Sequence, residues 1–556
     1  MTQPNTPRNR LYTRWGALKS ERATYLSHWK EISDYLLPRN GRFFVQDRNK
    51  GWRRHNNIYD STGTRALRVL GAGLMGGATS PARPWFRLAT ADPDMMDYAP
   101  VKLWLSQVQR QMMDIFAKSN TYRALHSMYE ELGAFGTSAS VVMDDYNDVI
   151  RHHVLTTGEF AIAQNYRGEV TTLYREFQKT VAELVGEFGY TKCSTTVQNL
   201  YDRGSLDQWI TIVHAIEPRS DRDPSKRDAL NMAWKSVYFE VGGNGDQFLS
   251  ESGFKQFPAM VPRWSVIGGD IYGSSPAMEA LGDVKQLQHQ QLRKAQGIDY
   301  MTKPPLQVPT SMKNQMVETL PGGISYVDAG SQTGGIKTAF EVNLNLDHLL
   351  ADIQDVRSRI NSSFYSDLFL MLASSPTSNM TATEVAERHE EKLLMLGPVL
   401  ERLHNELLDP LIERTFSRMI ETGLVPPPPE ELAGIDLNVE YVSMLAQAQR
   451  AVATNSIDRF VGNLGAVAQI KPEVLDKFDS DKWADAYADM LGVDPELIVP
   501  SERVALIRNQ RAQAAAQAQQ AEQMQQAATT ARDLSAAKTD DQSALTNVMG
   551  MFSGYQ

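Results

Sequence analysis

The sequence has only one cysteine, Cys193, among its 556 residues. A single cysteine cannot form a disulfide within the chain, and it excludes four-cysteine zinc sites and iron–sulfur clusters as well. Cys193 lies in the polar stretch Thr191–Thr195, where we expect a bystander rather than a catalytic thiol. This cysteine usage is typical of a protein that is assembled in a reducing cytosol.

The chain also lacks an excess of positive charge and a long apolar run. Its 56 Lys and Arg are outnumbered by 66 Asp and Glu, for a net charge of −10. Binding of nucleic acid over the whole surface is therefore excluded, and any DNA contact must be local or transient. The N-terminus has no apolar core of the kind found in signal peptides. The longest notable apolar run, Leu368–Ala373, is far shorter than the ~20 residues that span a bilayer, so we expect a soluble chain with no membrane partner.

The residues that are present have an ordinary globular composition, 42% hydrophobic and 22% charged, over a length that suffices for about three or four domains. Apolar residues recur every three or four positions over residues 11–37, with only Arg22 interrupting, which predicts an amphipathic helix. Residues 57–132 are expected to form helices that are separated by the segment Gly71–Gly77 and by a turn at residues 80–84.

An antiparallel β region is expected from Ser138 to about Phe177, because the apolar period falls to two there. The acidic residues of Asp144–Asp148 could bind a hard cation, but a hairpin turn explains them more readily. Two short helices and two further strands are expected at residues 180–188, 196–201, 209–216 and 234–241.

Two helices are predicted to flank a compact insert in the middle of the chain. Apolar stripes indicate one helix from Pro276 to about Tyr300 and another from Leu346 to Phe364. The residues between them cannot form one long helix, because they include Pro304, Pro305, Pro309, Pro321, Gly322 and Gly323.

The segment Ser374–Asn379 is small, polar and uncharged. Thr381–Glu384 then has the form of a capping box and opens a helical pattern that reaches about Thr422. Pro398 and Pro410 lie inside this pattern, which predicts a kinked helix.

The C-terminal part changes composition, since eight of the twenty residues of Arg511–Thr530 are Ala and seven are Gln. Both are good helix formers, but the segment has too few large apolar groups to bury itself alone. It is expected to be either a disordered tail or a helix that packs against copies of itself.

One motif suggests nucleotide chemistry. The glycines Gly71, Gly73 and Gly76 match the dinucleotide fingerprint by letter, but no buried strand is expected before them, and Pro81 and Pro84 would break the required helix. No phosphate-binding P-loop occurs either. A nucleotide-binding enzyme built on the Gly71–Gly76 segment remains the main alternative function.

No other motif indicates catalysis. The segment His389–Leu393 begins like a zinc-protease helix but lacks the second histidine, and no paired carboxylates or Ser/His/Asp arrangement stands out. We therefore expect a non-enzymatic chain without catalytic residues, bound metal or cofactor.

A succession of local signatures carries a family resemblance. They are Ile58–Gly63, Leu74–Leu88, His214–Arg219, Glu251–Pro258, Arg263–Trp264, Tyr272–Pro276 and Met380–Glu384. Over about residues 10–425 the chain resembles the head-to-tail connector, or portal, proteins of short-tailed bacteriophages. The part beyond Leu424 matches no signature of that family.

The resemblance implies the α+β phage portal fold, with a wing, a helical stem, a clip and a crown. It also implies a homo-oligomeric ring of twelve subunits at the unique capsid vertex of the virion, through which double-stranded DNA is packaged and ejected. The expected parts are N-terminal helices and wing in residues 1–275, first stem helix in 276–300, clip in 301–340, second stem helix in 341–363, tunnel loop in 364–380, kinked wing-to-crown helix in 381–423, crown in 424–500, and an Ala/Gln-rich helical barrel with a flexible tail in 501–556.

The same resemblance gives candidate DNA contacts. The tunnel-loop candidates are Ser374, Ser375, Thr377, Ser378 and Asn379, whose neutral groups offer at most weak hydrogen bonds to phosphate. Arg293, Lys294 and Lys303 at the lower stem are basic candidates, which could equally pair with neighbouring carboxylates. An overall negative wall would repel phosphate and prevent sticking.

Partners also follow from the resemblance. Because the chain has no motor motif, energy for translocation must come from an ATPase, which in this family is the large terminase subunit. The other implied partners are a tail adaptor or head-completion protein, the major capsid protein and scaffolding proteins, with assembly in the host cytoplasm. An internal capsid scaffold or core protein remains a second alternative.

Overall fold

The computed structural model describes residues 6–43, 57–96, 98–226, 228–242, 247–308, 313, 336–339, 347–373, 395–432, 437–443, 460–469, 471–491, 499 and 501–536. The chain divides into two compact units, one formed by residues 1–89 with 104–463 and the other by residues 90–103 with 464–556. The first unit contains both helices and strands, which agrees with the α+β part of the predicted fold class. In the described parts, no helix is both long and apolar enough to cross a membrane.

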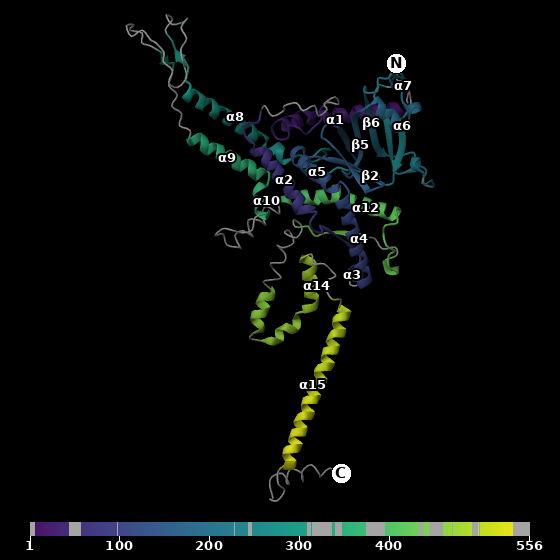
Figure 1. Cartoon of the computed structure of the whole chain (residues 1–556), viewed down its shortest axis with the longest axis vertical. Helices are drawn as coiled ribbons and strands as arrows, with labels where there is room; N and C mark the ends of the chain where they lie inside the picture. Colours follow the sequence, from purple (N-terminus) through teal and green to yellow (C-terminus); the bar gives the residue numbers. More distant parts are fainter. Residues whose placement is uncertain are drawn as a thin grey trace. The chain divides into compact units, whose positions relative to one another are not determined.

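Helix α1 (Pro7–Tyr35) packs on one face of a five-stranded antiparallel sheet (Figure 1). The strand order is β4 (Phe160–Gln164), β5 (Val170–Thr180), β6 (Trp209–Pro218), β7 (Trp234–Glu240) and β8 (Ser250–Phe254). Leu11, Trp15 and Leu18 of α1 form a core with alternate residues of the sheet. Arg22 is also buried, and it donates a 2.6 Å hydrogen bond to the carbonyl oxygen of Phe160, which satisfies the polar group that interrupts the apolar stripe.

The opposite face of this sheet carries two short helices, α6 (Val181–Phe188) and α7 (Thr195–Asp202), which the 3-10 turn η1 (Tyr190–Lys192) connects. Thr180 and Glu183 form the capping box that starts α6. Cys193 is buried in the apolar cluster beneath these helices, and burial raises the pKa of its thiol to about 11. The thiolate is therefore scarce at neutral pH, which agrees with a bystander role.

A second, three-stranded sheet has the order β3 (Val149–Leu155), β2 (Ala139–Asp145) and β9 (Ala259–Met260). The carboxylate of Asp145 accepts hydrogen bonds from the N–H groups of Asn147 (2.7 Å) and Asp148 (3.0 Å), so the predicted hairpin turn is confirmed. The side-chain amide of Asn120 exchanges two 2.8 Å hydrogen bonds with the backbone of His152. It thereby covers part of the outer edge of β3, as a further strand would.

Helix α2 (Thr62–Ala78) runs unbroken through the glycine-rich segment, so the prediction that Gly71–Gly77 separates two helices is wrong. Close packing outweighs the low helix propensity of glycine. A Cβ atom on Gly73 would lie 2.2 Å from the Phe369 ring of α10 (Ser366–Ala373), and one on Gly71 would lie 2.8 Å from Glu130 of α5 (Thr121–Phe135). These glycines therefore allow α5 and α10 to approach α2 closely.

A long helical segment follows the predicted capping box, which itself lies outside the described residues. Residues 395–403 are helical, His404–Leu408 form the wider π turn η4, and α12 spans Asp409–Glu421. The π turn ends at Leu408, two residues before Pro410, which has no N–H to donate. The helix ends at Glu421, next to the predicted end at about Thr422, and Gly423 follows with a φ of +71°.

A buried ion pair ties the π turn to the sheets. Arg263, whose side chain is 2% exposed, contacts the carboxylate of Glu406 at 2.6 Å. Its guanidinium also donates to the side chain of Gln164 and to the carbonyl oxygens of Gly168 and Ile271. All three nitrogens of the guanidinium are therefore hydrogen-bonded, as a buried charge requires.

Short elements complete the first unit. They are η2 (Ala229–Asn231), η5 (Glu430–Leu432) and the two strands β1 (Phe86–Thr90) and β12 (Leu437–Tyr441), which pair with each other. Helix α4 (Ala99–Lys118) belongs to the second unit up to Leu103 and to the first unit from Trp104 onward.

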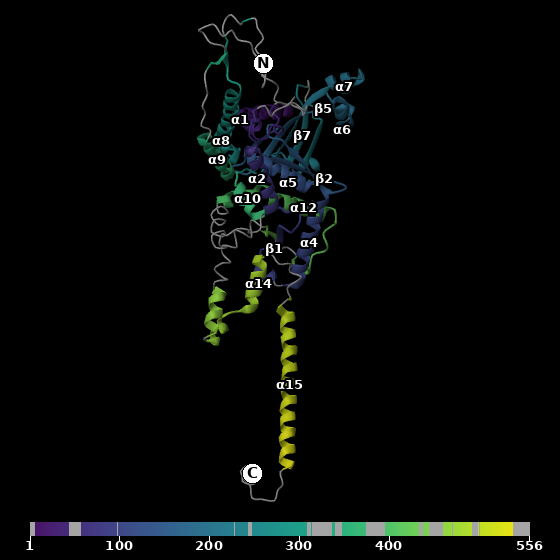
Figure 2. The ribbon, with the colours of Figure 1, turned by 60° about the vertical axis from the view of Figure 1, so that its left-hand side comes forward.

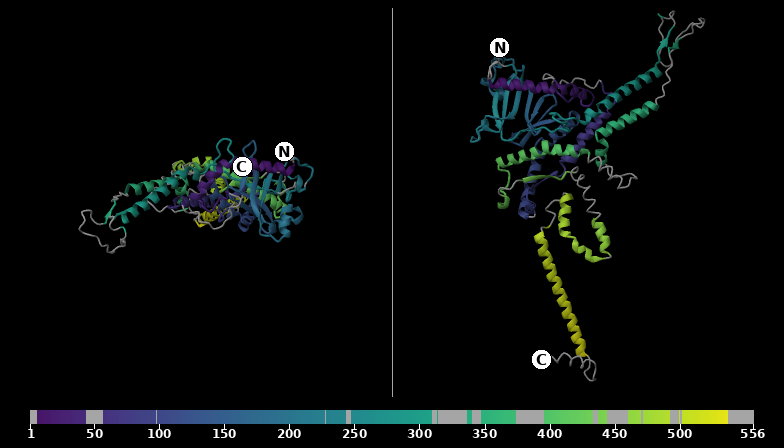
Figure 3. Two further views of the ribbon diagram at one scale, coloured as in Figure 1. Left: turned by 90° about the horizontal axis from the view of Figure 1, so that it is seen from above. Right: turned by 180° about the vertical axis from the view of Figure 1, so that it is seen from behind.

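The second unit holds α3 (Pro93–Met96), η6 (Pro472–Lys477), α14 (Ser480–Leu491) and α15 (Ser501–Ala536). The Ala/Gln tract lies in α15, one continuous helix (Figure 3). Every residue from 505 to 530 is exposed, so the tract is a helix that buries none of its faces within this chain. Its packing against other copies stays a prediction.

Candidate functional site

The helices α8 (Pro276–Thr302) and α9 (Asp347–Ser363) lie side by side (Figures 1 and 2). Each buries one apolar stripe, made of Leu281, Val284 and Leu287 on α8 and of Ile353, Val356 and Ile360 on α9. The two predicted helices that flank the insert are thus present. A partly exposed ion pair between Arg359 and Asp283, at 3.4 Å, adds little stability to their contact.

The far end of this helix pair exposes apolar and basic groups. Ile298, Tyr300 and Met301 near the end of α8 are each between 40% and 49% exposed. A small hairpin of β10 (Leu306–Gln307) and β11 (Lys337–Thr338) follows. Such exposed apolar side chains at the end of a helix pair suit contact with another protein.

The basic candidates lie on or just after α8. Arg293 makes long contacts of 3.4 Å with His289 and Gln296, and Arg293, Lys294 and Lys303 form no ion pair with any carboxylate of the described residues. Their positive charges are therefore uncompensated within the described part of the chain.

Only some of the other predicted site residues lie within the described part of the chain. Pro304 and Pro305 are half-buried between α8 and β10. The insert residues Pro309, Pro321, Gly322 and Gly323 and the loop residues Ser374, Ser375, Thr377, Ser378 and Asn379 lie outside the described residues. The first part of the expected tunnel loop forms helix α10, and the hydroxyl of Ser366 at its start lies 3.5 Å from the carbonyl oxygen of Ala66 in α2.

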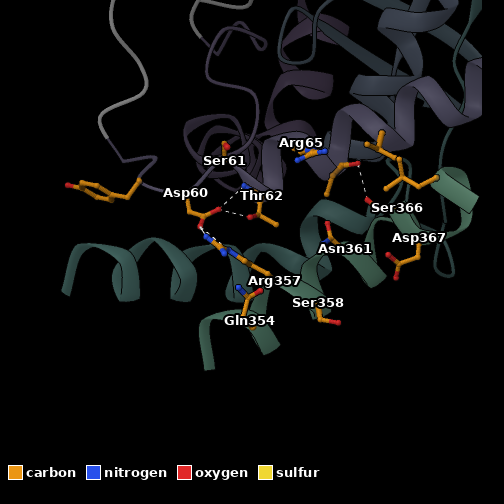
Figure 4. A pocket seen from close by; sticks show the side chains of 14 residues that line it. Asp60, Ser61, Thr62, Arg65, Gln354, Arg357, Ser358, Asn361, Ser366 and Asp367 are labelled. Carbon is orange, nitrogen blue, oxygen red and sulfur yellow. Dashed lines mark hydrogen bonds and ion pairs between the residues drawn. The ribbon is translucent and has the colours of Figure 1, made fainter. Parts of the chain in front are cut away.

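A buried carboxylate, Asp60, joins the start of α2 to both long helices (Figure 4). Its Oδ1 accepts hydrogen bonds from the N–H and the hydroxyl of Thr62, at 2.8 and 2.5 Å. Its Oδ2 accepts from Arg357 of α9 at 2.7 Å and from Gln291 of α8 at 2.9 Å. Burial acts to raise the pKa of Asp60, but the hydrogen bonds from Thr62 and Arg357 outweigh it and lower the pKa.

The buried side chain of Gln288 completes the cluster. Its Oε1 accepts from the N–H groups of Tyr59 (2.6 Å) and Asp60 (2.8 Å), and its Nε2 donates to the carbonyl oxygen of Asp60 (2.9 Å). Gln288 was not among the residues predicted from the sequence. The only signal was a glutamine beside the apolar stripe of α8, and nothing local connects it to residues about 230 positions earlier.

A polar groove of about 770 Å³ opens beside the cluster. Its lining comes from α2, α9, α10 and the segment before α2, and includes Tyr59, Ser61, Arg65, Gln354, Ser358, Asn361, Ser366, Asp367 and Leu370 (Figure 4). The lining therefore presents hydroxyl, amide, carboxylate and guanidinium groups. Among the described residues, no group of three or more His, Cys, Asp or Glu could hold a metal ion.

Comparisons with known proteins give full-length similarities. A model for the family described as bacteriophage head to tail connecting protein matches residues 8–499. The chain is 69% identical over 550 residues to a probable portal protein of Bordetella phage BPP-1, with 99% of each chain covered. It is 49% identical over 544 residues to a portal protein of Salmonella phage epsilon15, with 98% of each chain covered.

Solved structures give weaker likenesses. A chain from the virion of a native gene transfer agent particle is 10% identical, with a TM-score of 0.31, and the likeness covers 78% of this chain and 94% of that one. A chain from the neck of an empty gene transfer agent particle is 11% identical, with a TM-score of 0.36 and coverage of 84% and 99%.

Proposed function

Since this chain belongs to the family of bacteriophage head-to-tail connecting proteins, we propose that it is the subunit of a portal ring. Twelve copies close around an axial channel at the unique vertex of the capsid, and viral DNA passes through the channel during packaging and ejection. The full-length identity to two phage portal proteins carries this proposal. Both relatives are named as portal proteins, which agrees with the expected non-enzymatic role.

The parts of a portal subunit are proposed along the chain as follows. The wing comprises residues 1–275, the stem comprises α8 and α9, and the clip between them comprises residues 301–340. The tunnel loop comprises residues 364–380 and includes α10. The kinked helix of residues 381–423 leads to the crown in residues 424–500, and α15 contributes to a helical barrel. Two packed helices that flank an insert support the stem, and the unburied faces of α15 support an oligomeric barrel.

The Asp60 cluster, defined as Asp60, Thr62, Gln288, Gln291 and Arg357, fixes the stem in this proposal. Every member holds α8, α9 or the start of α2 in place through short hydrogen bonds. A ring under load from moving DNA needs a stem that keeps its orientation, and a largely buried charged network resists displacement because breaking it leaves an unpaired charge. The polar groove beside it is proposed as a contact for the next subunit in the ring.

Passage of DNA follows from charge. At −10 per chain, twelve copies carry roughly −120, which repels phosphate and limits sticking. The uncompensated Arg293, Lys294 and Lys303 are proposed as local contacts for phosphate at the lower stem. The large terminase subunit would supply the energy, and the tail adaptor, capsid and scaffolding proteins would dock on the ring.

The nucleotide-enzyme alternative does not fit the helix that holds its motif. Gly71, Gly73 and Gly76 lie inside α2, whereas the fingerprint requires a turn between a strand and a helix. No strand precedes α2 in the described part of the chain. The scaffold alternative is less well supported than a portal subunit, because both relatives are named as portal proteins.

Negative-stain electron microscopy of the purified chain tests the proposal. We expect rings with a central opening in class averages at micromolar concentration. Monomers alone under every assembly condition, or solid particles without an opening, would contradict a portal ring.

A further inference from the structure

Arg175 lies in the middle of β5, on the face of the five-stranded sheet that is turned away from α1. Its Nε donates a hydrogen bond to Nδ1 of His214 at 3.2 Å, and its guanidinium lies over the Phe177 ring at 4.5 Å from the ring centroid. The aromatic contact and the histidine together restrict where the guanidinium can lie.

His214, which accepts the hydrogen bond from Arg175, is fully buried. Its ring stacks on Tyr238 with centroids 3.9 Å apart, and its Nε2 lies 2.8 Å from the hydroxyl of Ser236. Burial lowers the pKa of His214, and the charge of Arg175 lowers it further. The ring therefore stays neutral, so Nδ1 accepts from Arg175 while Nε2 donates to Ser236.

The outer edge of the Arg175 guanidinium is left without a partner. Within the described residues, no acceptor contacts either terminal amino group, and both reach solvent. The nearby carboxylate of Glu159 lies 3.7 Å from Arg42, and the charges of Arg42 and Arg175 both oppose the rise in its pKa that burial causes, but Arg175 forms no ion pair with it. The ammonium of Lys179 pairs with Glu187. A second histidine nearby, His153, has its pKa lowered by burial and by the charge of Arg175.

We propose that this free edge of Arg175 binds a carboxylate of a second copy of the chain. Two parallel terminal amino groups match the two oxygens of a carboxylate, and a guanidinium that is already oriented loses little freedom on binding. Acidic residues outnumber basic ones by 66 to 56, so a neighbouring copy offers acceptors in excess. The inference rests on the proposed function only in that copies meet in a ring, where one face of each subunit contacts a different face of the next.

A phosphate of DNA is a poorer match. Arg151 and Lys179 add positive charge around the neighbouring His153, but Glu183 and Glu187 interact with Lys179. Together with the negative net charge of the chain, these carboxylates disfavour a polyanion at this place. The neighbouring rings of Phe177, Phe188 and Tyr238 are half-buried against the apolar cluster beneath α6 and α7, so the surroundings of Arg175 are partly apolar, as in the contacts between protein subunits.

Carbodiimide cross-linking of R175K rings tests the proposal, because it joins an amine to a carboxylate only where the two are in contact. We expect mass spectrometry to find a peptide that links position 175 to an Asp or Glu of another copy. Mixed rings of isotope-labelled and unlabelled subunits distinguish such a link from one within a subunit. The existing contact between Lys179 and Glu187 serves as an internal check on the reaction.

The R203K variant is the matched control, since Arg203 is an exposed arginine at the end of α7, on the same side of the five-stranded sheet as Arg175. It should give no equivalent link. R175Q should raise the subunit concentration at half-assembly about tenfold, which corresponds to about 1.4 kcal/mol per subunit contact. R203Q should leave that concentration unchanged.

Two failures can be told apart. Normal rings without an intersubunit link at position 175, or with links only to carboxylates of the same subunit, would overturn the role of Arg175 and leave the portal ring intact. A wild-type chain that forms no rings would instead contradict the proposed function. Loss of DNA binding by R175Q without any change in assembly would show that phosphate is the ligand, and would also overturn the proposal.

Discussion

Replacing Glu131 by glutamine should remove a large part of the pH dependence of the subunit's stability. Glu131 lies in α5 and is 3% exposed. Its carboxyl accepts hydrogen bonds from the N–H (3.3 Å) and the hydroxyl (3.4 Å) of Thr157, in the turn between β3 and β4. Burial raises the pKa of Glu131 from 4.5 to about 8, although the hydrogen bonds from Thr157 act in the opposite direction.

The direction in which pH changes the free energy of unfolding follows from the number of protons that each state binds. Between pH 4.5 and about pH 8 the folded state holds a proton on Glu131 that the unfolded state has lost. The free energy of unfolding therefore falls as pH rises through this window, by about 1.4 kcal/mol per pH unit. Between pH 5 and pH 8 the contribution of this one group is about 4 kcal/mol.

The assay is urea unfolding of the wild type and E131Q, followed by tryptophan fluorescence at several pH values from about 5 to 8. Glutamine is neutral and keeps an acceptor for Thr157, so the difference in stability between the two proteins should shift by about 4 kcal/mol in favour of E131Q as pH rises. E401Q removes an exposed carboxylate and should show no such shift. A difference between wild type and E131Q that stays constant across the range would refute the buried, protonated carboxyl.

Three further outcomes are expected. G73A should destabilise the subunit by about 1–3 kcal/mol in thermal or urea unfolding, because the added Cβ has no room beside Phe369. G76A should be neutral or stabilising by up to about 1 kcal/mol, because nothing lies within 4 Å of that position. Equal effects of the two variants would contradict the close helix contact. R263M should cost about 1–3 kcal/mol, because the partly buried Glu406 loses its ion pair with Arg263 and keeps only the one with Arg402. The double variant R263M/E406L should recover part of that loss, and a fully additive double variant would show that the pair is not coupled. Deletion of residues 374–379 should leave rings intact in micrographs but reduce DNA packaging or retention, and loss of the rings would instead assign the segment a structural role.

Local patterns predicted most elements of the fold but few of the contacts between them. The period of three to four residues predicted α1, and Arg22 was recognised as an interruption, but its burial depends on a carbonyl oxygen 138 residues later in the chain. The capping residue Thr180 and the turn residue Asp145 act within three residues, so their roles could be anticipated. Contacts between residues that are close in the sequence can be predicted from local patterns, whereas contacts between residues far apart in the sequence cannot.

The glycine segment shows why local propensity can mislead. Gly71 and Gly73 favour a break when only neighbours along the chain are considered, but in the fold they lie where Glu130 and Phe369 come close. The Asp60 cluster was missed for a related reason, since Arg357 lies 297 residues from Asp60 and no spacing rule connects them. The family signatures marked the segment around Asp60 without giving its physical role.

Cryo-electron microscopy of intact particles, reconstructed without imposed symmetry, tests the central claim most directly. The account predicts one ring of this chain at a single capsid vertex, with duplex DNA on its axis in filled particles. Copies spread over all vertices, or a ring whose axis is closed and excludes DNA in every state, would contradict it.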